Sequence, residues 1–175
     1  WWYNRRDYFQ SRNMEVAMTM RDKTCCFTGH RNIPKDQIPI LTEKVTATIQ
    51  MLAAQGIVYY GAGGALGFDT ISAMAVLKLQ RIIPQIKLIL VLPCLSQAQR
   101  WSKNDQEIYE FIKAQANKVV YTSQDYTRDC MFKRNRHLVD YSGTCICYLT
   151  KQQGGTAYTV EYAKRKGLEI INLAD

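Results

Sequence analysis

The feature that most constrains this chain is a regular alternation of short apolar runs with longer segments of helical periodicity. The short runs predict six strands, at residues 24–28, 57–60, 87–93, 118–122, 144–149 and 169–173. Apolar residues at helical spacing predict the helices between them, at residues 37–55, 68–80, around 108–112, 128–142 and 156–166. Strict strand–helix alternation is typical of a mostly parallel sheet with helices on both faces. We therefore expect an α/β fold, a Rossmann-like three-layer α/β/α sandwich.

A chain of 175 residues has room for one such domain, which we place at residues 23–175. Residues 1–22 are expected to be an N-terminal extension or tail, because they lack the basic-then-apolar order of a signal peptide. The sequence contains no apolar run of about 18 residues, the length needed to cross a membrane. We accordingly expect a cytoplasmic protein that does not act at a membrane.

Six cysteines accompany only two histidines, and no C-x-x-C pair occurs. Cys25 and Cys26 fall in the first predicted strand, and Cys145 and Cys147 fall in the fifth. This placement favours buried free thiols, and it predicts no metal site.

The loop after the second predicted strand has four glycines in the seven residues 61–67. Backbone N–H groups of such a loop can point at an anion, and the dipole of the following helix favours the same charge. Gly63, Gly64 and Gly67 are therefore candidate ligand-binding residues. Asp69 follows in the first helical turn, where it either contacts the ligand or compensates the helix dipole. The loop matches neither G-x-G-x-x-G nor a P-loop.

Two further loops follow predicted strands. Gly29, His30 and Arg31 combine a close backbone approach with a titratable donor and a planar cation suited to phosphate. Gly154 and Gly155 precede Thr156, which is either an N-cap or a ligand contact. In parallel sheets such loops meet at the carboxyl ends of the strands, where ligands bind.

The segment 128–142 adds two polar candidates. Asn135 falls on the otherwise apolar face of the predicted helix, so it must find a hydrogen-bond partner or line a site. Arg134 and Arg136 flank it, and we expect Arg134 to point into the same cavity as the glycine loops.

The formal charge of +8 favours anionic partners in general and does not separate a mononucleotide from a nucleic acid. The eleven tyrosines are scattered along the sequence rather than grouped with basic residues. Nucleic acid is therefore the least favoured partner.

Five segments, in order, resemble one family. They are C-C-F-T-G-H-R at 25–31, G-G-A-L-G-F-D at 63–69, L-P-C followed by Gln97 and Trp101, K-R-N-R-H-L-V-D at 133–140, and G-G-T-A-Y-T-V-E-Y-A at 154–163. Together they are similar to the SLOG superfamily, the Rossmann-like group that unites DprA/Smf and LOG proteins, and within it to the YpsA-like branch. The resemblance implies a pocket for a nucleotide or nucleotide derivative, and a link to bacterial cell division or growth control.

Three functions follow from this resemblance. The first is a regulatory protein that binds a nucleotide of ADP-ribose or NAD type, needs no cofactor, and is compatible with a homodimer. The second is a LOG-like phosphoribohydrolase with Glu161 as its catalytic carboxylate, although Gln153 replaces the proline of the LOG signature and Glu161 is out of its register. The third is single-stranded DNA binding, as in DprA proteins. The sequence favours binding over catalysis.

Overall fold

The computed structural model describes residues 20–174, in which strands and helices alternate as predicted. The strands are β1 (Thr24–Gly29), β2 (Tyr59–Ala62), β3 (Lys87–Leu92), β4 (Lys118–Tyr121), β5 (Thr144–Tyr148) and β6 (Glu169–Asn172). The helices are α2 (Ile38–Ala54), α3 (Phe68–Leu79), α4 (Lys103–Gln115), α5 (Cys130–Asp140) and α6 (Gly155–Arg165). The predicted N-terminal extension lies almost wholly outside the described residues.

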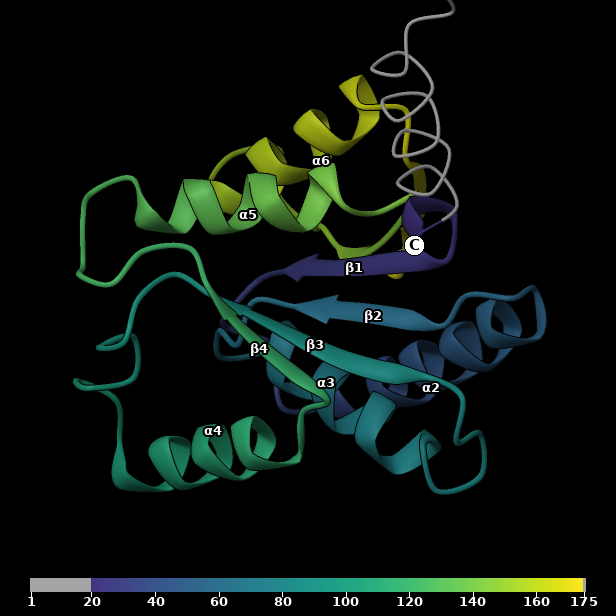
Figure 1. The fold of residues 1–175 in the computed structure, drawn as a ribbon, viewed down its shortest axis with the longest axis horizontal. Coiled ribbons are helices and arrows are strands. Elements are labelled where there is room, and N and C mark those ends of the chain that lie inside the picture. The colour runs from purple at the N-terminus through teal and green to yellow at the C-terminus, as the bar shows by residue number, and fades with distance from the viewer. Residues whose placement is uncertain (1–19, 175) are drawn as a thin grey trace, which may run out of the picture.

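All six strands are parallel and form one sheet in the order β4-β3-β2-β1-β5-β6. The chain therefore adds strands outward from β1 to β4 and then returns to the other side of β1 for β5 and β6. Figure 1 shows α2, α3 and α4 on one face of the sheet and α5 and α6 on the other. The predicted Rossmann-like α/β/α sandwich is confirmed, with an entirely parallel sheet.

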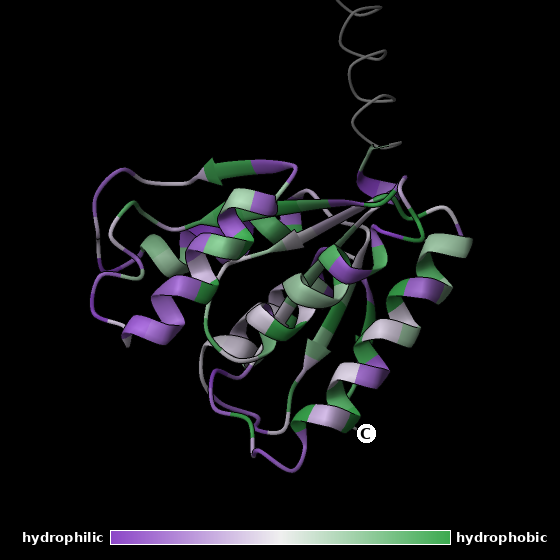
Figure 2. Cartoon of the chain, turned by 90° about the horizontal axis from the view of Figure 1, so that it is seen from below, coloured by the Kyte–Doolittle hydropathy of each residue, from purple (hydrophilic) through white to green (hydrophobic). Residues whose placement is uncertain are grey.

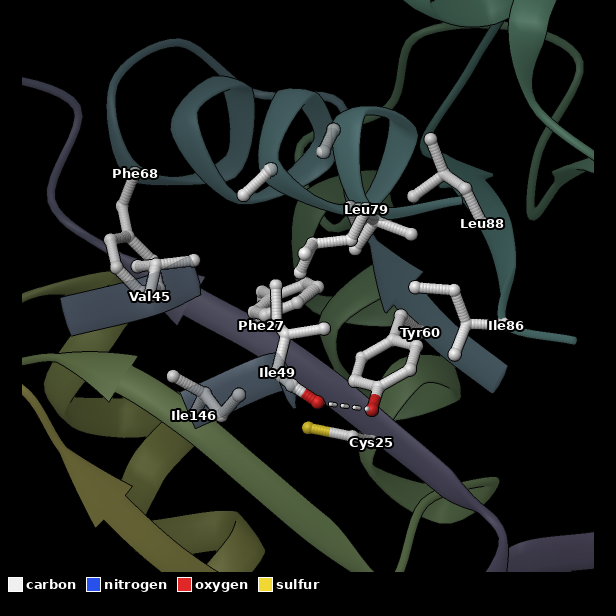
Figure 3. Packing of buried hydrophobic residues seen from close by; sticks show 14 of the residues in the cluster. Cys25, Phe27, Val45, Ile49, Tyr60, Phe68, Leu79, Ile86, Leu88 and Ile146 are labelled. Carbon is white, nitrogen blue, oxygen red and sulfur yellow. Dashed lines mark hydrogen bonds between the residues drawn. The ribbon is translucent and has the colours of Figure 1, made fainter. Parts of the chain in front are cut away.

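The larger part of the core lies between the sheet and α2, α3 and α4. Val45 and Ile49 of α2 meet Phe27 and Tyr60 of the sheet, as Figure 3 shows. The buried Tyr60 hydroxyl donates to the Ile49 carbonyl at 3.1 Å, which satisfies its polar end. Phe27 contacts Tyr60 with stacked rings 6.1 Å apart.

A second cluster lies under α5 and α6 and includes two neighbouring strand cysteines, Cys26 and Cys145. All six cysteines are buried free thiols, as predicted. Hydrophobic residues dominate the strands, whereas hydrophilic residues recur along the helices (Figure 2). No helix within residues 20–174 is long and apolar enough to cross a membrane.

Candidate functional site

The three predicted loops lie at one edge of the sheet because they follow the adjacent parallel strands β2, β1 and β5. Direct hydrogen bonds join them. The Phe68 backbone N–H donates to the His30 carbonyl at 3.1 Å, which ties the first loop to the second. The Thr150 backbone N–H donates to His30 Nε2 at 3.0 Å, which ties the first loop to the third. The order of strands reverses between β1 and β5, and at such a point a parallel sheet opens a crevice.

Asp69 organises the second loop. One of its carboxylate oxygens, Oδ2, accepts the backbone N–H groups of Gly63 at 3.1 Å and Ala65 at 3.2 Å. These two N–H groups are therefore not open to an anion, which corrects the expectation that the loop N–H groups are free. Burial raises the pKa of the Asp69 carboxyl, and the nearby Arg134 charge acts in the opposite direction.

Two positions of this loop must be glycine because other atoms lie too close for a side chain. A Cβ on Gly63 would overlap the Arg134 guanidinium. Gly67 has φ +76°, and a Cβ there would overlap the carbonyl of Arg31 on the first loop. The glycine content of the second loop thus serves packing against Arg134 and against the first loop.

Arg134 reaches the second loop from α5, on the opposite face of the sheet. Its buried guanidinium donates to the Gly63 carbonyl, and its Nε donates to Asn135 Oδ1 at 2.7 Å. Burial lowers the pKa of Arg134, and the Asp69 carboxylate opposes that shift.

Asn135 continues this network to the third loop. Its Nδ2 donates to Thr159 Oγ1 at 2.9 Å, and that hydroxyl donates to the Gly155 carbonyl at 2.8 Å. A chain of side chains therefore connects Gly63 to Gly155 through α5 and α6. Both polar candidates on the predicted helix have defined partners.

Arg136 points the other way. It donates through Nε and Nη2 to the Tyr158 hydroxyl on α6, at 2.9 and 2.6 Å. Its guanidinium lies 5.8 Å from the ring centroids of both Tyr158 and Tyr162, whose rings are almost parallel. Arg136 thus belongs to an exposed surface between the two helices.

The third loop leaves the N-terminus of α6 open. Gly154 has φ +98° and lets the chain enter the helix at Gly155, one residue earlier than the sequence suggested. Thr156 therefore lies inside the first turn, and the N-cap role expected for it is wrong. No side chain caps this helix, and a Cβ on Gly154 or Gly155 would meet nothing within 4 Å. The first N–H groups of α6 therefore have no side-chain acceptor among the described residues.

Glu161 lies in a groove of about 410 Å³ that starts at this helix end. The groove runs between the third loop and one face of α6, with Gly154, Tyr158, Glu161, Lys164 and Arg165 among its lining residues. The Glu161 side chain is exposed, so the sequence-predicted carboxylate and the open helix terminus share one surface. Gly64 lines a different, enclosed cavity of about 30 Å³ behind the second loop.

Gln97, which follows β3, is a site residue to which the sequence assigned no role. Its buried Nε2 donates to the carbonyls of Gly63 and Gly64, at 3.3 and 3.2 Å. Its Oε1 and the Tyr109 hydroxyl are both buried, and neither has a hydrogen-bond partner within the described chain. The only sequence signal for Gln97 was its place after the L-P-C segment.

Residues 25–170 match the family model YpsA, described as the YspA SLOG family. This chain belongs to the YpsA SLOG family. UPF0398 proteins of Bacillus thuringiensis (strain Al Hakam) and Bacillus cereus (strain AH187) are 33% identical over 135 residues, 75% of this chain and 71% of each relative. The resemblance found in the motifs is confirmed.

Two solved structures show how this YpsA SLOG fold compares with larger proteins. DNA processing protein A of Streptococcus pneumoniae matches with a TM-score of 0.63 at 18% identity, over 86% of this chain and 50% of that one. The Helicobacter pylori protein, whose structure describes single-stranded DNA binding, matches with a TM-score of 0.62 at 18% identity, over 89% and 66%. At these identities the likeness shows the fold alone.

Proposed function

We propose that this YpsA SLOG protein binds a nucleotide or a nucleotide derivative of ADP-ribose or NAD type and acts as a regulatory protein. The observation that carries the proposal is the open N-terminus of α6 at Gly154 and Gly155, beside the reversal of strand order between β1 and β5. Uncapped N–H groups and the positive end of the helix dipole favour a phosphate at this point.

The adjoining groove supports the proposal. Its volume of about 410 Å³ lies within the range of about 300–1,000 Å³ that is usual for small-molecule sites. From the helix start it offers an aromatic ring at Tyr158 and cations at Lys164 and Arg165. A ligand with phosphate at one end and a ring system or further charge beyond it matches this order of groups. A role in bacterial cell division or growth control belongs to the same proposal and rests on the family resemblance.

The test is a thermal-shift screen with nucleoside monophosphates, NAD and ADP-ribose, followed by calorimetric titration. A ligand at a hundredfold its dissociation constant stabilises the folded state by about 2.7 kcal/mol. A Lys164→Ala/Arg165→Ala variant should bind at least tenfold more weakly. Lys78→Ala/Arg81→Ala, which removes two exposed cations near the end of α3, is the matched control and should bind normally. Absence of binding by every nucleotide at millimolar concentration would refute the proposal.

A second candidate function is hydrolysis of the N-glycosidic bond of a nucleoside monophosphate. The observation that favours it is the position of Glu161 in the same groove as Gly154. A carboxylate suits the oxocarbenium-like charge that develops on the ribose when the base leaves and water adds to the sugar. Incubation with nucleoside monophosphates and chromatography for free base tests this directly, with Glu161→Gln as the inactive variant.

A further inference from the structure

His30 occupies a central position at the edge of the sheet. Its Nε2 accepts the backbone N–H of Thr150, 120 residues away in the sequence. A ring nitrogen can accept only when it carries no proton, so the neutral ring must hold its proton on Nδ1. The bond is therefore specific for one protonation state of the imidazole.

One aromatic ring packs against the imidazole, and the backbone of His30 is held as well. It meets Tyr148, at the end of β5, edge-to-face with centroids 6.1 Å apart. Tyr148 in turn stacks on Phe68 at 6.1 Å, and the Phe68 N–H donates to the His30 carbonyl. His30 thus contacts the ends of β5 and α3 as well as the third loop.

The titratable and charged groups around the ring are few. Lys151 on the third loop and Tyr148 on β5 face it, and Arg31 follows it on its own loop. Burial, and then the positive charge of Lys151, lower the pKa of His30 from its ordinary value of 6.5. Both effects favour the neutral ring that the bond to Thr150 requires.

We propose that His30 is a positioning residue: its neutral imidazole clasps the third loop at Thr150 and holds Gly154 and Gly155 in the ligand-binding arrangement, and protonation opens this clasp. The positioning part rests on the nucleotide-binding function proposed above, whereas the clasp itself does not. An imidazolium has no acceptor for the Thr150 N–H and also repels Lys151.

The direction of the pH effect follows from the lowered pKa. The unfolded chain takes up a proton near pH 6.5 while the folded clasp still resists it. The contribution of the clasp is complete above that pH and is lost as the pH falls through 6.5 towards the lower folded value. Acidification should therefore loosen the third loop.

The clasp can be tested without ligand. Nitrogen-15 NMR at pH 8 should show the proton of His30 on Nδ1, and the Thr150 amide should be protected from hydrogen exchange. The protection, corrected for the intrinsic exchange rate, should be constant above pH 6.5 and fall as the pH is lowered below it. A His30→Gln variant, whose side-chain oxygen accepts but does not titrate, should keep constant protection. A proton on Nε2, or a Thr150 amide equally exposed in wild type and His30→Ala, would overturn the clasp.

Its effect on binding can be measured with ADP-ribose, because a diphosphate diester keeps its charge between pH 5 and 8. The affinity of wild type should fall as the pH is lowered from 8 to 5, by about fivefold once the ring is fully protonated, which corresponds to one hydrogen bond of about 1 kcal/mol. His30→Gln should retain its affinity at both pH values, and His30→Ala should be weak at both. His137→Gln, which changes the other histidine of the chain on α5, is the matched control and should behave as wild type.

The outcomes separate the two proposals. Failure of every variant to bind ADP-ribose or another nucleotide would refute the proposed function, and the NMR and exchange measurements would still decide the clasp. Normal binding with the same pH profile in wild type and His30→Gln would overturn the positioning role.

Discussion

Substitution of Asp69 tests whether the second glycine loop is shaped from within. Both loop N–H groups that Asp69 accepts, from Gly63 and Ala65, converge on the single oxygen Oδ2. Asp69→Ala would leave two buried donors without an acceptor. Each such donor costs about 1–3 kcal/mol, so we expect a loss of about 3 kcal/mol in the free energy of unfolding. For a domain of this size that loss lowers Tm by about 6–12 °C.

Asp69→Asn separates geometry from charge. An asparagine Oδ1 in the place of Oδ2 can accept both N–H groups and removes a buried carboxylate whose pKa burial raises. Because a raised pKa means that the folded state binds the proton more readily than the unfolded one, ionised Asp69 destabilises the fold at pH 7. This destabilisation is relieved as the pH falls towards 3.8. Loss of the charge opposite Arg134 offsets part of the gain, so we expect stability within about 1 kcal/mol of wild type.

Urea unfolding followed by circular dichroism at pH 7 measures these differences, with Asp125→Ala, an exposed loop aspartate, as the control. We expect the order of stability to be wild type and Asp69→Asn together, with Asp69→Ala well below them. Equal losses in the alanine and asparagine variants would show that the charge opposite Arg134, and not the two hydrogen bonds, holds the loop. An alanine variant as stable as wild type would refute the reasoning altogether.

Three further predictions concern the site. Arg134→Ala should weaken nucleotide binding more than tenfold in calorimetric titration, because its charge-assisted hydrogen bonds to the Gly63 carbonyl and to Asn135, about 1.5–3 kcal/mol each, hold the network that reaches Gly155. Unchanged affinity would show that this network does not position the third loop. Gly155→Ala should leave Tm unchanged or slightly raised, because the added Cβ would meet no other atom. The same methyl group should weaken ligand binding by blocking the approach to the start of α6. Normal binding would show that the phosphate binds at another place. If the wild type releases free base, Glu161→Gln should abolish that release, as measured by chromatography.

The order and type of every described strand and helix could be predicted because hydrophobic periodicity reports burial directly. The exact ends of the strands and helices were harder to predict. Residues 57–60 look like one apolar strand, yet β2 begins at Tyr59, because the N–H groups of Val58 and Tyr59 both go to the Lys23 carbonyl before the ladder starts. The start of α6 depends on the positive φ of Gly154, which composition does not reveal.

The candidate site was predictable in its location and not in its contacts. Three glycine-containing loops after strands indicate a shared edge, whereas the bond from Arg134 to Gly63 spans 71 residues and the bond from Gln97 to Gly64 spans 33. The tyrosines are a similar case. Tyr158 and Tyr162, spaced one helical turn apart, contact Arg136 of α5. These tyrosines and this arginine form a cluster in the fold, although the tyrosines look scattered along the sequence.

The two glycine-rich loops that precede helices look alike in sequence and differ in chemistry. The loop before α3 carries an acidic residue in the first helical turn, and that carboxylate takes up the N–H groups that an anion would otherwise bind. Neither helix is capped by a side chain at its start. The first N–H of α3, from Phe68, goes to the His30 carbonyl, whereas the first turn of α6 contains neither an acidic residue nor a capping side chain. The buried side chains of Asp69 and Arg134 therefore fix the conformation of the second loop. Hydrogen bonds through Asn135 and Thr159 connect Arg134 to Gly155 on the third loop. The anion binding proposed at α6 would then depend on residues that do not touch the anion, with the second loop as a scaffold for the proposed contact at the third.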